Sequence, residues 1–335
     1  DVNSSIPVLF SFSFNQLKVM IFKKNEGGNL GTMWQQEDRG RMSLPFISPR
    51  LCDLEVSFEF FPPKTAKMEE MLWDSIGVLA PLRPRFISVT YGAGGTTRAR
   101  THDIVTSIQT KTGLKAAAHL TCIGASRAEI DDVAREYWRS GIRHIVALRG
   151  DPPQGMEKTY VPPVDGYAYA SDLVLGLKKI AHFQISVAGS PETHPEALNA
   201  RVDMTYLKQK VDAGADRVIS QFFMEPEAFL AFRDRAVAAG INVPIIPGIL
   251  PITNFHKTVD FAGKCGARVP EWMETLFDKL DDQPKTRELV AATVAAEQCR
   301  VLYANGIRNF HFYTLNRAEL TLAICHMLGM RSETI

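Results

Sequence analysis

The sequence lacks the features that mark several large classes of protein. Its 38 lysines and arginines are almost matched by 37 aspartates and glutamates, which leaves a net charge of only +1. A dedicated nucleic-acid binder would need a basic excess to neutralise phosphates. The chain also has no apolar stretch near the roughly 20 residues that a membrane helix requires. These absences argue against both classes.

Cysteine is scarce and scattered. The five cysteines form no C-x-x-C pair and have no histidine partner at metal-ligand spacing. They are Cys52, Cys122, Cys265, Cys299 and Cys325. We therefore expect no metal site, and we expect a reducing compartment, the cytoplasm.

The first fifty residues differ from the rest of the chain. They mix Ser, Asn and Gly with a short apolar patch, residues 6–14, and show no sustained period. The patch has no basic segment before it and no small-residue cleavage site after it, so export is the weaker interpretation. We interpret residues 1–50 as a poorly ordered or non-catalytic extension and residues 51–335 as a single catalytic domain.

From Leu54 onward, short β-branched runs alternate with helical segments at intervals of roughly thirty residues, a pattern typical of βα units. The predicted strands are residues 54–61, 85–91, 115–121, 144–148, 184–188, 217–221, 244–249 and 309–313. Eight strands predict an α/β fold, a closed (β/α)8 TIM-type barrel. An open doubly wound sheet is the alternative, disfavoured because no G-x-G-x-x-G follows the first strand.

The first predicted strand carries a carboxylate near its end. Glu59 has the opposite parity from Phe58 and Phe60, and Pro62-Pro63 stop the strand directly behind it. In a parallel barrel Glu59 points into the mouth, where catalytic groups collect. At the edge of an open sheet it faces water instead. The strand pattern alone leaves both interpretations open.

Polar and glycine-rich segments follow the predicted strands. A turn at residues 91–97 has glycines that suit either an anion nest or ordinary turn chemistry. A long loop runs from Leu148 to about Tyr169, and loops of that length are usually functional or disordered. Polar groups after successive strands predict an active site at the C-terminal face.

Six segments together resemble the methylenetetrahydrofolate reductase family, short bacterial type, in order and spacing from about Val56 to Gly329. They are Phe58-Glu-Phe-Phe-Pro-Pro-Lys, Ser88-Val-Thr-Tyr-Gly-Ala-Gly-Gly-Thr-Thr, His119-Leu-Thr-Cys, Ala147-Leu-Arg-Gly-Asp, His194-Pro-Glu-Ala and His311-Phe-Tyr-Thr-Leu-Asn-Arg. The resemblance implies a barrel that binds FAD and uses NADH, with NADPH not excluded. The implied reaction converts 5,10-methylenetetrahydrofolate to 5-methyltetrahydrofolate by ping-pong hydride transfer and supplies methyl groups for methionine synthesis. It also implies a homo-oligomer.

The resemblance implies a set of cofactor-binding residues. These are Thr90, Tyr91, Ala93, His119, Arg149, Gly150, Asp151, Tyr169, Ala170, Ser190, His194, Asp203 and Lys210. Ser190 departs from the family, which often has an aromatic residue there that covers part of the cofactor. Lys210 is expected near the diphosphate, although a solvated helix lysine is the ordinary alternative.

The resemblance also implies catalytic and substrate-binding residues. Glu59 is the general acid, and we expect burial among aromatic rings to raise its pKa. Asp151 is expected to stay ionised and to stabilise a cationic iminium. Substrate-binding positions are Glu59, Asp151, Gln221, Phe261 and Arg317. For Arg317, a barrel-rim ion pair is the alternative.

Two other functions remain open at this point. One is a flavin-free, pterin-binding methyltransferase barrel, and the other is a flavoprotein that binds FAD without turnover. The presence of Glu59, Asp151 and Gln221 together favours an active enzyme.

Overall fold

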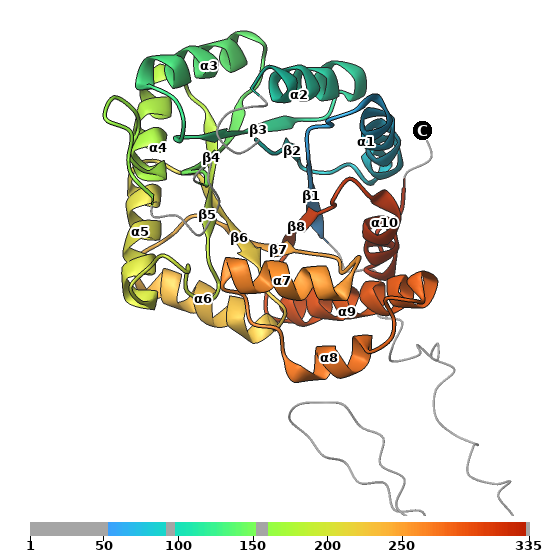
Figure 1. The fold of residues 1–335 in the computed structure, drawn as a ribbon. Helices are drawn as coiled ribbons and strands as arrows, with labels where there is room; N and C mark the ends of the chain where they lie inside the picture. The colour runs from blue at the N-terminus through green and yellow to red at the C-terminus, as the bar shows by residue number, and fades with distance from the viewer. Residues whose placement is uncertain (1–52, 92–97, 152–159, 333–335) are drawn as a thin grey trace, which may run out of the picture. The chain divides into compact units, whose positions relative to one another are not determined.

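Eight parallel strands close into a barrel surrounded by helices (Figure 1). The computed structural model describes residues 53–91, 98–151 and 160–332. The strands are β1 (Glu55–Phe60), β2 (Ile87–Val89), β3 (Ala116–Thr121), β4 (His144–Leu148), β5 (Gln184–Gly189), β6 (Arg217–Phe222), β7 (Ile245–Ile249) and β8 (Asn309–Tyr313). Because β1 pairs with both β2 and β8, the sheet has no edge there. The predicted (β/α)8 barrel is confirmed, and the open sheet is excluded.

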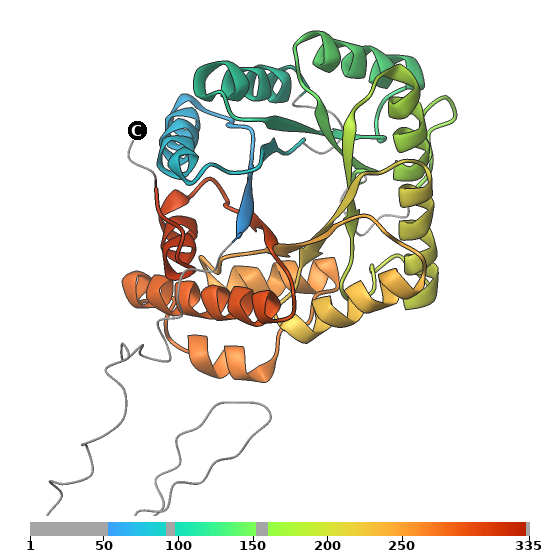
Figure 2. The same ribbon diagram turned by 180° about the vertical axis from the view of Figure 1, so that it is seen from behind.

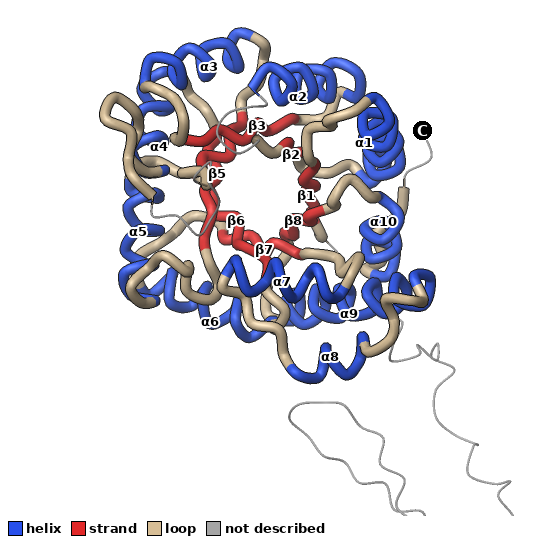
Figure 3. The backbone as a smooth tube through the Cα atoms, viewed as in Figure 1, coloured by secondary structure: helices blue, strands red, loops and turns tan. Residues whose placement is uncertain are grey.

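Helices cover the outside of the barrel, as the tube drawing and the view from behind both show (Figures 2 and 3). They are α1 (Ala66–Leu79), η1 (Ala80–Leu82), α2 (Arg98–Thr112), α3 (Arg127–Arg139), α4 (Ala170–Ile180), α5 (Ala200–Asp212), α6 (Pro226–Ala238), α7 (Phe255–Cys265), α8 (Glu271–Phe277), α9 (Pro284–Ala304) and α10 (Ala318–Met327). The β7–β8 connection departs from the simple repeat, because it contains α7, α8 and α9. Of these, α8 lies outside the ring (Figure 3).

Local signals in the sequence define several helix starts. The predicted capping box at Ser126 and Glu129 is present at the start of α3. Asn199 and Asn254 cap α5 and α7, each accepting hydrogen bonds from backbone N–H groups of the first turn. These caps fix where two helices begin beside the C-terminal ends of the strands.

Strand alternation separates an apolar outer layer from a partly polar interior. Phe58 and Phe60 are fully buried in the outer core between strands and helices. Inside the barrel, an apolar group of Phe86, Ala117, Val146 and Ile219 is accompanied by buried serines and histidines. Branched aliphatic side chains usually fill such interiors. The interior of this barrel is therefore more polar than is usual, and its histidines have hydrogen-bond partners such as Ser186 for His144 and Ser57 for His311.

Other expectations concern the periphery of the domain. The extension predicted for residues 1–50 lies outside the described residues, as does Cys52. The remaining four cysteines are free thiols. None of the helices in the described ranges is long and apolar enough to cross a bilayer.

Candidate active site

Two cavities adjoin at the ends of the strands. The mouth cavity, of about 280 Å³, is lined by Glu59, His119, Gln221, Phe261 and other residues at the top of the barrel. The side cavity, of about 300 Å³, lies between strands β4 to β6 and helix α5. Both are lined by Leu148, Ala188 and Gln221. A ligand that passed these three residues would occupy both cavities.

Glu59 lies in the mouth cavity, held between two imidazoles. Its Oε2 atom is 3.2 Å from Nε2 of His119 and 3.3 Å from Nε2 of His311. The His311 contact is a hydrogen bond, whereas the His119 contact has an ion-pair distance without hydrogen-bond alignment. The side chain of Glu59 is 14% exposed, so it still meets the cavity. Of the two interpretations of Glu59, the inward-facing one is correct.

Ser57 continues this polar cluster below Glu59. Its Oγ atom lies 2.7 Å from Nδ1 of His311 and 3.5 Å from the carbonyl oxygen of Phe310. An ionised carboxylate only accepts hydrogen bonds. Nε2 of His311 must therefore carry the hydrogen and donate it in the hydrogen bond to Glu59. The other ring nitrogen, Nδ1, is hydrogen-bonded to the Ser57 hydroxyl. Ser57 and Glu59, two residues apart on β1, thus hold one imidazole by both nitrogens.

The expected direction of the pKa shift at Glu59 is wrong. Burial raises the pKa of this carboxyl, but His119 and His311 outweigh burial and lower it to about 2. The expectation placed Glu59 among aromatic rings, whereas strand alternation directs Phe58 and Phe60 to the opposite face. Phe61 is 43% exposed and lines the mouth. The neighbours that decide the charge come from β3 and β8.

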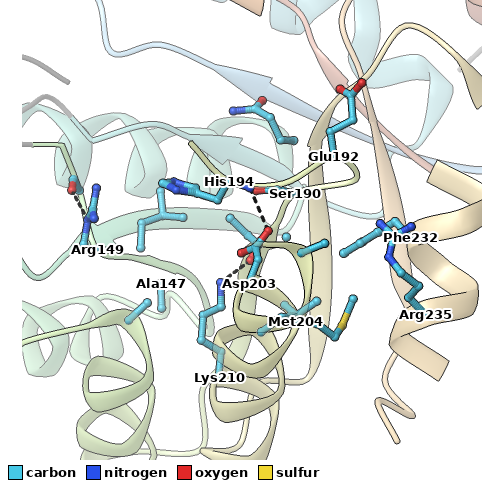
Figure 4. A pocket seen from close by; sticks show the side chains of 18 of the residues that line it. Ala147, Arg149, Ser190, Glu192, His194, Asp203, Met204, Lys210, Phe232 and Arg235 are labelled. Carbon is cyan, nitrogen blue, oxygen red and sulfur yellow. Dashed lines mark hydrogen bonds between the residues drawn. The ribbon is translucent and has the colours of Figure 1, made fainter. Parts of the chain in front are cut away.

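The side cavity contains a desolvated lysine on α5. Lys210 donates from Nζ to the carbonyl oxygen of Ala188 at 2.6 Å. Burial lowers its pKa to about 8, although Asp203 opposes the shift. Asp203 accepts a hydrogen bond from the backbone N–H of His194 at 3.0 Å. Figure 4 shows Asp203 and Lys210 side by side in this cavity. Lys210 is therefore not a solvated helix lysine.

A second cation of the side cavity follows β4. Arg149 makes a two-pronged ion pair with Glu196 and lies over the ring of Tyr160, 4.6 Å from its centroid. Gly150 has φ +87°, and a Cβ atom there would come within 2.6 Å of Ile123. Only glycine fits this turn, which carries Arg149 and Asp151 to the cavity rim. Asp151 itself is exposed.

The predicted site residues divide between the two cavities. The mouth contains Glu59, Thr90, Tyr91, His119, Gln221 and Phe261. The side cavity contains Arg149, Gly150, Asp151, Ala170, Ser190, His194, Asp203, Lys210 and again Gln221. Glu59 and Asp151 thus line different cavities.

A few predicted residues lie elsewhere. Tyr169 and Arg317 line neither cavity and are exposed residues that precede α4 and α10. Ala93 and most of the glycine-rich turn lie outside the described residues, as do residues 152–159 of the long loop.

Sequence reasoning assigned no role to several residues of the site. His311 contacts Glu59, and Tyr313 and Leu315 line the mouth. The strand Asn309-Phe-His-Phe-Tyr313 alternates polar and apolar side chains, which was an available signal that His311 points inward. Arg235, from α6, lines the side cavity and had no comparable signal.

The side cavity is lined by charged side chains of both signs, with the carboxylates of Asp151, Glu192 and Asp203 beside three cations. Lys210, Arg149 and Arg235 all line it. Ligand pockets commonly measure about 300–1,000 Å³, and each cavity here lies near the lower limit. A dinucleotide-sized cofactor would therefore need both cavities, with its anionic part beside the cations and a ring at the mouth.

Comparisons with known proteins agree on one family. A model of the family "Methylenetetrahydrofolate reductase" matches residues 50–329. The 5,10-methylenetetrahydrofolate reductase of Escherichia coli (strain K12) is 55% identical over 296 residues, which cover 88% of this chain and 97% of that protein. The corresponding protein of Pectobacterium carotovorum is 54% identical over 84% of this chain and 92% of its own length.

More distant matches differ in extent. The Arabidopsis thaliana protein "Methylenetetrahydrofolate reductase (NADH) 1" is 36% identical over 83% of this chain but only 49% of its own length. An uncharacterized protein from Clostridium thermocellum, solved with two copies of 5-methyl-5,6,7,8-tetrahydrofolic acid, has a TM-score of 0.55 at 16% identity. It covers 82% of this chain and 94% of that chain, which shows a shared fold.

Proposed function

Because the chain belongs to the methylenetetrahydrofolate reductase family, we propose that it reduces 5,10-methylenetetrahydrofolate to 5-methyltetrahydrofolate with FAD as cofactor and NADH as reductant. The observation that carries the proposal is the carboxylate of Glu59, fixed by two imidazoles in a cavity that shares lining residues with the cavity of Lys210. The name of the Arabidopsis relative supports NADH, with NADPH as the alternative reductant.

The residues present fit FAD. Lys210, Arg149 and Arg235 would meet the diphosphate, and Asp203 and His194 would hold the sugar portion. The other predicted cofactor residues of the side cavity, Gly150, Ala170 and Ser190, would line its path. Serine is too small to cover the cofactor as an aromatic residue would, so Ser190 is assigned only as a neighbour.

Bound FAD would supply the hydride transfer that no amino-acid side chain carries out. Thr90, Tyr91 and His119 would surround its ring at the mouth, joined to the side cavity at Gln221. Ala93, which lies outside the described residues, and Tyr169 stay proposed as cofactor-binding residues. These residues would orient the ring and exclude water from the reacting face.

Glu59 is assigned the proton donation. Opening the five-membered ring of the substrate to an iminium requires a proton on the departing nitrogen. Because the lowered pKa leaves Glu59 ionised at neutral pH, Glu59 would first take up a proton from solvent or a neighbouring group and then pass it to the departing nitrogen. Glu59 is the carboxyl that lines the mouth cavity.

Other side chains are assigned to substrate recognition. Asp151 would stabilise the cationic iminium from the rim. Gln221 can donate and accept, which suits the pterin or the nicotinamide amide. Phe261 stacks on Phe222, with ring centroids 5.3 Å apart, and exposes 44% of its surface for a substrate ring. Arg317 is an exposed cation suited to the glutamate tail of the folate, with a rim ion pair as the alternative.

The proposed order is ping-pong, in which NADH and the folate would use the mouth cavity in turn. The product would supply methyl groups for methionine synthesis in the cytoplasm. Assembly into a homo-oligomer is also part of this proposal.

An anaerobic visible spectrum of the purified protein tests the proposal. NADH should bleach the flavin, methylenetetrahydrofolate should restore its absorbance, and initial-rate lines should be parallel. A colourless protein indifferent to NADH would instead support the flavin-free methyltransferase. A yellow protein that the folate does not reoxidise would support a flavoprotein without folate turnover.

A further inference from the structure

The turn that follows β8 is hydrogen-bonded to the end of β1. Thr314 donates from both its backbone N–H and its hydroxyl to the carbonyl oxygen of Glu59, at 3.2 and 2.6 Å. Asn316 accepts from the N–H of Phe61 at 2.8 Å and donates to the carbonyl oxygen of Phe61 at 3.0 Å. Phe61 lies one residue beyond β1. The Asn316 side chain makes the two backbone hydrogen bonds there that a neighbouring strand would otherwise make.

The hydrogen bonds between Asn316 and Phe61 matter because two prolines follow Phe61. Pro62 and Pro63 have no N–H group, so Phe61 carries the last backbone donor of this segment. Asn316 is itself buried and anchored, since its carbonyl oxygen accepts from the Ser75 hydroxyl at 3.0 Å. The position of Phe61 at the mouth therefore depends on the conformation of one asparagine.

The same turn is unusual in its backbone. Leu315 and Asn316 have φ values of +53° and +57°, both in the left-handed region. Asparagine tolerates this region, whereas leucine is strained there. Glycine would relieve the strain at position 315 at once. Of the five described non-glycine residues with positive φ, Leu315 is the one that lines the mouth cavity.

Leu315 lines the mouth cavity together with Glu59, Phe61 and Phe261. Phe61 and Phe261 are 43% and 44% exposed, an unusual state for large aromatic rings. With half-buried Leu315, they form an apolar wall beside the polar cluster at Glu59. Such a wall suits a flat heteroaromatic ring whose polar edge faces the opposite side.

We propose that Leu315 is a substrate-binding residue that packs on the planar ring of the bound substrate, and that Asn316 is the residue that positions this wall. The inference rests on the proposed function, since the rings in question are the pterin of the folate and the nicotinamide of NADH. The leucine side chain reaches the cavity only with this strained backbone conformation at position 315.

The test compares Leu315→Gly and Leu315→Ala with the wild-type holoenzyme. Both variants should raise the KM for NADH and for methylenetetrahydrofolate, and the Kd of 5-methyltetrahydrofolate measured by flavin absorbance, by about tenfold. That factor corresponds to about half of a leucine side chain's burial. The midpoint of thermal unfolding should be higher for the glycine variant than for the alanine variant, because only glycine relieves the strain.

Lys279→Gly is the matched control. Lys279 also has a positive φ, +57°, but its side chain is 86% exposed and lies outside both cavities. This variant should be as stable as the wild type or more so, with unchanged KM and Kd. If both Leu315 variants bound all three ligands within twofold of the wild type, the inference would be overturned. A wild-type flavin that the folate does not reoxidise overturns the proposed function as well.

Asn316→Gly and Asn316→Asp test the positioning role. Glycine keeps the backbone conformation but loses both hydrogen bonds to Phe61, so the folate half-reaction should slow at least tenfold in kcat. Aspartate keeps the oxygen that accepts from Phe61 and should recover part of that loss. Wild-type kcat in Asn316→Gly would contradict the positioning role.

Discussion

At the scale of single residues, the charge of Glu59 is set by partners far away in the chain. His119 and His311 come from β3 and β8, and the His311 contact spans 252 residues. Parity and the proline stop are local signals that left two orientations of Glu59 open, and the barrel implied by eight strands favoured the mouth. The sequence could not predict the direction of the pKa shift, because the two imidazoles become neighbours only after the barrel closes.

Substitution of Glu59 by glutamine should separate the two half-reactions. Glu59→Gln keeps size and the ability to accept a hydrogen bond from His311 but removes the carboxyl that would pass the proton to the substrate. Flavin reduction by NADH should survive, whereas reoxidation by methylenetetrahydrofolate should fall at least about 100-fold, the lower limit for general acid catalysis. Stopped-flow absorbance measures each rate separately. Equal losses in both half-reactions would assign Glu59 a structural role.

The same carboxyl should make stability depend on acid. The pKa of Glu59 is about 2 in the folded chain and 4.5 in the unfolded reference. A lowered pKa contributes stability above the unfolded value, and this is lost as pH falls from about 4.5 to about 2. In Glu59→Gln, the free energy of unfolding should therefore fall less steeply across this window.

Urea unfolding at a series of pH values measures this slope. Glu288→Gln, at an exposed position of α9, is the control and should keep the wild-type slope. Identical slopes for wild type and Glu59→Gln would contradict the lowered pKa.

At the scale of elements, the strands were predictable and the β7–β8 connection was not. Periodicity and flanking turns placed every strand, although β2 is shorter than the predicted 85–91. The additional helix α8 is only seven residues long and does not belong to the βα repeat. Its role appears only in the structure, where Phe277 of α8 stacks on Phe255 at the start of α7, with ring centroids 4.9 Å apart.

Asp281 follows α8 in the β7–β8 connection and contacts the start of α7 through Phe255 and His256. Its Oδ1 atom accepts from the N–H of Phe255 at 3.3 Å and lies 3.1 Å from Nη1 of the buried Arg287. Oδ2 pairs with the exposed His256. Because α7 carries Phe261 to the mouth, these contacts connect an outer loop to the site.

Removing the charge of Asp281 should loosen α7. Asp281→Asn should lower the free energy of unfolding by about 1–3 kcal/mol, since Arg287 is left without its charged partner. The KM for both substrates should rise, because Phe261 is held less firmly. Asp278→Asn, in the same loop with a 66% exposed side chain, is the control and should change stability by less than about 0.5 kcal/mol. Chemical unfolding and steady-state kinetics of the two variants decide the matter.

At the scale of the whole molecule, the eight strands in the sequence predicted a closed barrel. Closure of the barrel then brings the residues around Glu59 together. Glu59 on β1, His119 on β3 and His311 on β8 become neighbours only when β1 pairs with β8. The division of the predicted residues into mouth and side cavities could not be predicted from the sequence. It depends on how far each loop turns away from the barrel axis, as at Gly150 with its positive φ.

The proposal that residues 1–50 lie outside the catalytic unit leads to a prediction about the entire chain. All eight strands begin at or after Glu55, so a protein starting at Met42 retains the closed barrel. It should keep its flavin, its activity and the midpoint of thermal unfolding of the full chain. A protein starting at Lys64 lacks β1, which exposes edges of β2 and β8 and removes Glu59.

The shorter protein should fail to fold cooperatively or aggregate. Differential scanning calorimetry and flavin content compare both truncations with the full chain. Loss of flavin or of cooperative unfolding in the Met42 truncation would show that the first residues belong to the catalytic unit. The barrel would then depend on a segment outside its eight strands.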